Sequence, residues 1–143
     1  MKVVVDTNII VSGFLWRGPS HQIMDLASDR KIEIATTRLL FDELDQTLHY
    51  RKFKTRLRNA GLAVRDIKFN ASQILKFIRR STAGPSVLAD PLDDELLGCA
   101  IDFQASAVVT GDKKILDVGS IQDIPIMRAS QFLQKYFPPQ IEQ

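Results

Sequence analysis

Short apolar runs, each ended by polar residues, recur along the chain and predict the strands of a sheet. The first is residues 2–5, which contains three valines and is followed at once by Asp6. Similar runs cover residues 32–35, 86–89, 107–110 and 124–127. Runs this short that contain β-branched residues favour buried strands. Because Pro125 has no backbone N–H to donate to a neighbouring strand, we expect the last run at an edge of the sheet.

Between these runs, apolar residues recur every three or four positions and predict helices. Segment 38–50 is the clearest case, because Leu40, Leu44 and Leu48 fall on one side of it. Further helical patterns cover residues 21–27, 66–80, 96–101 and 130–137. Strands that alternate with helices favour an α/β protein whose parallel sheet is covered on both faces.

The length of 143 residues indicates a single domain over residues 1–143, with a tail at 138–143. Residues 81–85 are interpreted as a loop within that domain. A composition of 45% hydrophobic and 25% charged residues is typical of a folded protein. No uninterrupted apolar run exceeds three residues, so we expect neither a membrane span nor a signal peptide. Cys99 is the only cysteine, which excludes an internal disulfide and is consistent with the cytoplasm.

The net charge of +2 conceals a strong partition along the chain. Segment 46–89 holds ten basic residues and one acidic residue, whereas the rest holds nine basic and sixteen acidic residues. Such a basic segment is typical of a polyanion-binding surface or of a solvated helical region, and composition leaves both open. Four aromatic residues in it are either base-stacking surfaces or part of the core. They are Tyr50, Phe53, Phe69 and Phe77.

Acidic residues directly follow three of the predicted strands: Asp6, the cluster at 90–95, and Asp112. Ligands of open α/β sheets bind beyond the carboxyl ends of the strands. Each acid alone also suits a turn or a helix cap. Several at one edge, however, repel one another and need compensation.

A fourth acid, Glu43, lies within the apolar arc of the predicted helix 38–50. An ionised glutamate is costly there unless it is paired, with Arg38 for example, or bound to a metal ion. In the cluster at 90–95, Asp93 is expected at a helix N-terminus facing the sheet edge, and it is the preferred acid for the site. Asp94 is the second choice for this role. A site made only of carboxylates suits Mg²⁺ or Mn²⁺ rather than Zn²⁺.

Four segments together resemble the PIN-domain ribonucleases, and most closely the toxin components of VapBC-type toxin–antitoxin modules. The segments are Val5-Asp6-Thr7-Asn8, Leu40-x-x-Glu43-Leu44, Asp90-Pro-x-Asp93-Asp94 before Leu97-x-x-Ala100, and Val109-Thr110-Gly111-Asp112-Lys113. The likeness spans about residues 1–118. The chain departs from the family at Lys114, where another acid is usual.

The resemblance implies a three-layer α/β/α sandwich with a central, mostly parallel sheet, and a ribonuclease that uses Mg²⁺ or Mn²⁺. The residues that match the acidic quartet are Asp6, Glu43, Asp93 and Asp112. The metal ligands implied among them are Asp6, Asp93 and Asp112. The supporting polar residues are Asn8, Thr110 and Asp94.

The resemblance also implies partners: an RNA substrate, a cognate antitoxin and a second copy in a homodimer. The basic residues expected to hold RNA phosphates are Arg51, Lys52, Lys54, Arg56 and Arg58. Residues 14–16 are apolar and belong either to a partner surface or to the core. The alternative function is that of a catalytically silent RNA- or protein-binding module on the same fold.

Overall fold

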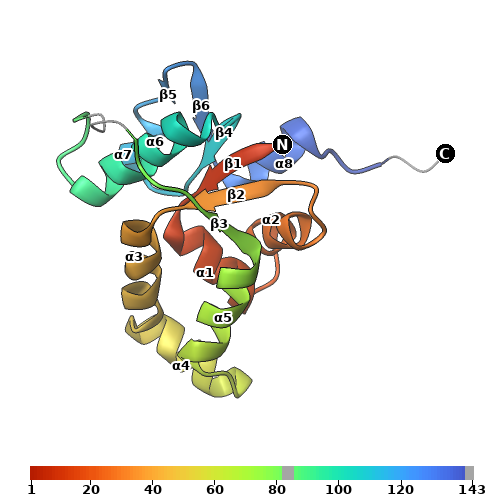
Figure 1. Ribbon diagram of the computed structural model, residues 1–143. Coiled ribbons are helices and arrows are strands. Elements are labelled where there is room, and N and C mark those ends of the chain that lie inside the picture. The colour runs from red at the N-terminus through yellow and green to blue at the C-terminus, as the bar shows by residue number, and fades with distance from the viewer. Residues whose placement is uncertain (82–85, 141–143) are drawn as a thin grey trace.

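The structure, a computed structural model, describes residues 1–81 and 86–140 (Figure 1). Six strands form one sheet in the order β3-β2-β1-β4-β6-β5, and all neighbours are parallel except β5 and β6. The strands are β1 (Lys2–Val5), β2 (Glu33–Thr36), β3 (Leu75–Phe77), β4 (Ala107–Val109), β5 (Ser120–Ile121) and β6 (Ile124–Met127). The mostly parallel sheet of the sequence analysis is therefore confirmed.

Helices cover both faces of the sheet (Figure 1). They are α1 (Thr7–Leu15), α2 (Pro19–Ser28), α3 (Arg38–Leu48), α4 (Arg51–Ala60), α5 (Val64–Ile74), α6 (Pro91–Phe103), α7 (Lys113–Leu116) and α8 (Ala129–Tyr136). One core lies between the sheet and α1, α2, α5 and α8, and a second lies between the sheet and α6 and α7. This arrangement is the expected three-layer sandwich. No described helix is long and apolar enough to cross a membrane.

The valines of β1 explain why the chain opens with an unbroken apolar run. Val3 and Val5 point into the core beneath α1, whereas Val4 points into the core beneath α6. All three are buried, since β1 pairs with β2 on one side and with β4 on the other. A central parallel strand has no solvated face, so it cannot alternate between apolar and polar residues.

The strand expected at residues 86–89 is not formed, and this prediction was wrong. The third strand on that side is β3, which lies at the end of the helix expected over residues 66–80. Helix α5 stops at Ile74, and the chain then extends so that Phe77 pairs with Thr36 of β2. A segment of only three residues, Leu75-Lys76-Phe77, carries no clear period, so pairing with the sheet decides its conformation.

The position of β6 also differs from the expectation, because β6 is not an edge strand. It lies between β4 and the two-residue strand β5, with Pro125 opposite Ser120. A ladder this short tolerates the missing N–H of a proline. Of the predicted loop at 81–85 and tail at 138–143, residues 82–85 and 141–143 lie outside the described residues, and 138–140 are neither helix nor strand.

An ion-pair network fixes the end of β3 to helix α6. The Arg80 guanidinium donates hydrogen bonds to Glu95 and, at 2.7 Å, to Asp102. The Thr37 hydroxyl at the start of α3 donates to the other oxygen of Glu95 at 2.8 Å. Gly98 leaves room for the guanidinium, because a Cβ there would lie 2.3 Å from its central carbon. The network thus joins β3, α3 and α6.

We expect Gly98→Ala to destabilise the protein by about 1–3 kcal/mol, because the methyl group displaces Arg80 and leaves two carboxylates without their cation. Urea denaturation measures this free energy of unfolding. In an Arg80→Ala background the same substitution should cost far less, since nothing is left to displace. Equal costs in the two backgrounds would contradict this account of Gly98.

Candidate active site

The carboxyl ends of β1 and β4 meet where the strand order reverses. From β1 the chain continues to β2 on one side, whereas β4 lies on the other side of β1. Asp6 directly follows β1, and its backbone N–H donates to the carbonyl oxygen of Val109 at 2.8 Å. Asp112 follows β4 three residues later. Such a crevice is the usual ligand site of an open α/β sheet.

Thr110 links the two acids. Its hydroxyl donates to the Asp6 carboxylate at 2.7 Å and accepts the backbone N–H of Asp112 at 3.1 Å. The side chain is fully buried, which fixes the hydroxyl between the two strands. The Asp112 carboxylate in turn accepts the N–H of Lys114 at 2.9 Å at the start of α7.

Burial dominates the electrostatics of Asp6. Desolvation raises the pKa of its carboxyl, and the nearby charge of Asp112 raises it further. The hydrogen bonds from Thr110 and from the backbone N–H of Asn8 act in the opposite direction. Asn8 therefore supports Asp6 through its backbone N–H, and Asn8 itself is exposed.

Glu43 projects from α3 toward the start of α1. Its Oε2 accepts a hydrogen bond from the Thr7 hydroxyl at 3.1 Å. Burial raises the pKa of this carboxyl, and Asp6, Asp90 and Asp93 add to the increase by repulsion. Among the described residues Glu43 forms no ion pair with Arg38, the alternative that the sequence left open.

Thr7 is the contact that the sequence analysis missed. It is a buried hydroxyl directly after Asp6. Because helix α1 begins at Thr7, its side chain turns toward α3 rather than along the sheet. A hydroxyl next to a candidate acid at a strand end was the available signal.

Asp93 and Asp94 lie in the first turn of α6 but serve different neighbours. Burial, followed by repulsion from Asp90 and Asp112, raises the pKa of Asp93 to about 6, while Lys114 opposes the increase. Asp94 Oδ1 instead accepts the backbone N–H groups of Val87 and Leu88, at 3.1 and 2.9 Å. Of the two, Asp93 is therefore the residue whose pKa the charges of the other acids raise.

The side chains offer only oxygen donors, and these suit a hard divalent cation such as Mg²⁺ or Mn²⁺. In donor chemistry the residues fit such an ion. Over residues 1–81 and 86–140, however, no three His, Cys, Asp or Glu side chains form a ready-made metal-binding group. The acids nevertheless lie close enough to raise one another's pKa values.

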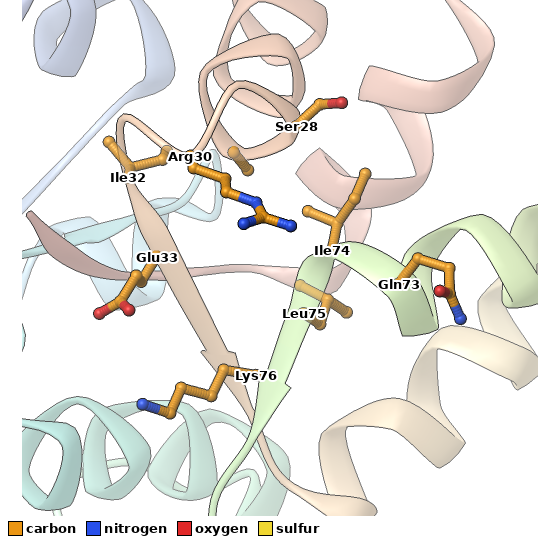
Figure 2. A pocket seen from close by; sticks show the side chains of 9 residues that line it. Ser28, Arg30, Ile32, Glu33, Gln73, Ile74, Leu75 and Lys76 are labelled. Atoms are coloured by element: carbon orange, nitrogen blue, oxygen red, sulfur yellow. The ribbon is translucent and has the colours of Figure 1, made fainter.

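A separate cavity of the described protein lies elsewhere. It has a volume of about 620 Å³ and opens at the amino ends of β2 and β3, opposite the acids (Figure 2). Its one carboxylate, Glu33, points away from Arg30, whose guanidinium points toward Ile74 (Figure 2). Without a second acid it cannot perform the chemistry of the acidic crevice, which we take as the candidate site.

Comparison with protein families matches residues 2–114 to the family described as "PIN domain". Comparison with solved structures finds a similar chain in the crystal structure of VapBC2 from Rickettsia felis bound to a DNA fragment from their promoter. The match has a TM-score of 0.58 and 16% sequence identity, and covers 88% of this chain and 97% of that chain. The search of curated proteins found no match.

The raised pKa of Asp93 predicts how the stability of the metal-free protein depends on pH. A carboxyl whose pKa is higher in the folded than in the unfolded state stabilises the fold at low pH, and this contribution is lost as the pH rises through about 6. With a chelator present, the melting temperature should fall by roughly 2–4 °C between pH 5 and pH 7.

Asp93→Asn removes the titrating group and should reduce this fall. Asp94→Asn is the matched control, because it changes the adjacent acid of the same helical turn and should keep the wild-type profile. Thermal unfolding followed by circular dichroism at the two pH values measures both. A fall that is undiminished in Asp93→Asn would refute the assignment.

Proposed function

The chain belongs to the PIN-domain family, and from this premise we propose that it is a Mg²⁺- or Mn²⁺-dependent endoribonuclease. Members of this family are generally nucleases. The observation that carries the proposal is the gathering of four carboxylates from separate segments at one sheet edge: Asp6, Glu43, Asp93 and Asp112. The reaction is hydrolysis of an RNA phosphodiester bond by water.

In this proposal Asp6, Asp93 and Asp112 would hold the divalent ion. When bound, the ion lowers the pKa of water and offsets the negative charge of the phosphate. Thr110 orients the Asp6 carboxylate by its hydrogen bond to Oδ2.

Glu43 would orient the attacking water and take its proton. The Thr7 hydroxyl holds Oε2 of Glu43, so Oε1 is the oxygen that faces the water. Its raised pKa makes this carboxylate a stronger base than an ordinary glutamate.

Lys114 supports a site for one ion rather than two. It lies where the family usually has another acid, and its charge lowers the pKa of Asp93. A cation in this position takes the place of an acidic ligand and offsets part of the negative charge that a second ion would neutralise.

Helix α4 is the proposed surface for RNA phosphates at a distance from the acids. Arg51, Lys54 and Arg58 are exposed and form no ion pair with any described residue. Two other cations of α4 also make contacts within the protein. Arg56 donates to the Leu15 carbonyl oxygen at 2.9 Å and lies over the Trp16 ring, and Lys52 lies over Phe53.

The distance from this surface to the acids follows from α1. Thr7 at its start contacts Glu43, and Leu15 at its end contacts α4. Nine helical residues span roughly 13 Å. An RNA that reaches both places must therefore extend over several nucleotides.

We also propose that the protein is the toxin of a toxin–antitoxin pair, acts in the cytoplasm and forms a homodimer. The structural likeness to the VapBC2 complex supports an antitoxin partner. Of the apolar residues 14–16, Leu15 lies in the core, whereas Trp16 is 39% exposed and is available to a partner.

We expect Asp6→Asn and Asp93→Asn to abolish metal-dependent cleavage, because each removes a charged ligand. In the wild type, Mn²⁺ at about 100 times its dissociation constant should stabilise the fold by about 2.7 kcal/mol, and both variants should lose this gain. Asp94→Asn should retain both properties. The assay is cleavage of total RNA, with Mn²⁺ or with chelator, beside thermal unfolding.

A wild-type protein that binds RNA but does not cleave it would favour the silent binding module instead. Asp6→Asn that cleaves at the wild-type rate would contradict the site itself.

The α4 surface makes a separate prediction about salt. Replacing Arg51, Lys54 and Arg58 by glutamine removes three phosphate contacts. The negative slope of log affinity against log salt should therefore become shallower by about 2 for single-stranded RNA. Binding is measured in the Asp6→Asn background, which prevents cleavage. The matched control replaces Arg30, Lys31 and Lys135 by glutamine. It lowers the net charge by the same amount and should leave the slope unchanged.

A further inference from the structure

A second cleft lies beside the acids, between the start of α3 and the segment that follows β3. Its volume is about 580 Å³. The lining residues used below are Arg38, Leu39, Phe77, Arg79 and Glu95. None of these residues has a part in the function proposed above, so the cleft requires its own explanation.

The register of the sheet places this cleft next to the acids. Phe77 pairs with Thr36, and Thr36 follows Ala35, which pairs with Val4. Val5 is therefore the neighbour of Thr36, and Phe77 is two strand spacings from Val5, or about 10 Å. Asp6 comes directly after Val5, so Phe77 and the acids share one edge of the sheet.

The cleft exposes apolar side chains that are held in place. Phe77 is 49% exposed, and its ring packs against Phe41 with the centroids 5.0 Å apart. Leu39 is likewise 49% exposed. An aromatic ring fixed by a neighbour and open to solvent is a surface on which a nucleobase can stack.

The charges around the cleft favour an anionic occupant. Arg38 and Arg79 are exposed, and their side chains form no hydrogen bond or ion pair with any described residue. The single acid in the lining, Glu95, is already bound by Arg80 and Thr37. An apolar surface flanked by two available guanidinium groups complements a nucleotide, whose base is planar and whose phosphate is negative.

The other aromatic residues of the basic segment differ from Phe77. Phe53 is fully buried, and the Tyr50 ring stacks on it. Phe69 is 65% exposed, but it lies on α5, outside the lining of the cleft. Phe77 thus combines exposure with a place beside the acids.

We propose that this cleft binds one nucleotide of the RNA substrate adjacent to the cleaved bond, with its base stacked on Phe77 and its phosphate bound by Arg38 and Arg79. The inference rests on the proposed ribonuclease function. It identifies where the protein binds the nucleotide next to the cleaved bond. A stacking position of this kind would contribute to the choice of cleavage site.

The test uses an RNA oligonucleotide with one cleavage site and a series in which single nucleotides are made abasic. In the wild type, one abasic position next to the cleaved bond should lower kcat/KM by roughly 5- to 100-fold. Phe77→Leu keeps the apolar volume but removes the ring, so it should lose a similar factor on intact RNA. In that variant the abasic replacement should cause no further loss of kcat/KM.

Phe69→Leu is the matched control and should behave as the wild type at every position. Arg79→Gln tests the phosphate contact without touching the Phe41–Phe77 pair, and it should raise KM while kcat is little changed. A melting temperature equal to that of the wild type shows that each variant is folded.

A readout without cleavage separates this inference from the proposed function. A 2-aminopurine is placed at each position of the oligonucleotide in turn. At one position its fluorescence should be quenched on binding to Asp6→Asn, but at no position on binding to the double variant with Phe77→Leu. Equal quenching by both proteins, or an abasic cost that persists in Phe77→Leu, would overturn the nucleotide site. If Phe77→Leu instead weakens only the binding of an antitoxin protein, the cleft belongs to a protein partner and the inference is wrong.

If the wild type does not cleave any RNA with Mn²⁺, the ribonuclease proposal fails on its own. The quenching measurement then decides separately whether the cleft binds a base.

Discussion

Four carboxylates at one edge of a sheet repel one another, and the structure around them limits the cost of that repulsion. Two of the acids are held by neutral hydroxyls, Thr110 for Asp6 and Thr7 for Glu43, rather than by cations. A hydroxyl fixes the carboxylate without neutralising it, so the charge remains available to an ion. The full ion pairs with Arg80 are instead formed by Glu95 and Asp102, which lie about two turns apart on one face of α6 and stabilise the fold.

The sequence predicted those features that depend on local pattern. The valines of β1, the apolar face of α3 with Glu43 within it, and the order of the acids along the chain all reflect burial or periodicity that one segment reveals. Asp93 was preferred over Asp94 from its position on the helix, and the structure gives Asp94 a different partner in the backbone of residues 87–88. The roles of these residues in catalysis remain predictions.

Features that depend on contacts between distant segments could not be read from the sequence. The three residues of β3 follow a helix without a break, and only their pairing with β2 makes them a strand. Residues 86–89 have an equally good strand composition, yet the backbone N–H groups of Val87 and Leu88 donate to the Asp94 side chain instead of to a neighbouring strand. Thr7 was missed for the same reason, since its partner is 36 residues away.

The cations of the chain, within the basic segment 46–89 and outside it, differ in their relation to the acids. Exposed charges are screened beyond about 8 Å at physiological salt, so cations offset the carboxylates only when they lie near the sheet edge. Lys114 meets this condition, because its charge lowers the pKa of Asp93. Helix α4 is separated from the acids by roughly the 13 Å length of α1 and therefore acts on RNA but hardly on the site. Arg38 and Arg79 lie between these limits, because they line the same cleft as Phe77, which is about two strand spacings from Val5. They are near enough to position a phosphate beside the acids, yet too far to replace a divalent ion among them. The charge pattern that composition left open is thus consistent with one distant surface that attracts RNA and a nearer pair of arginines that aligns it.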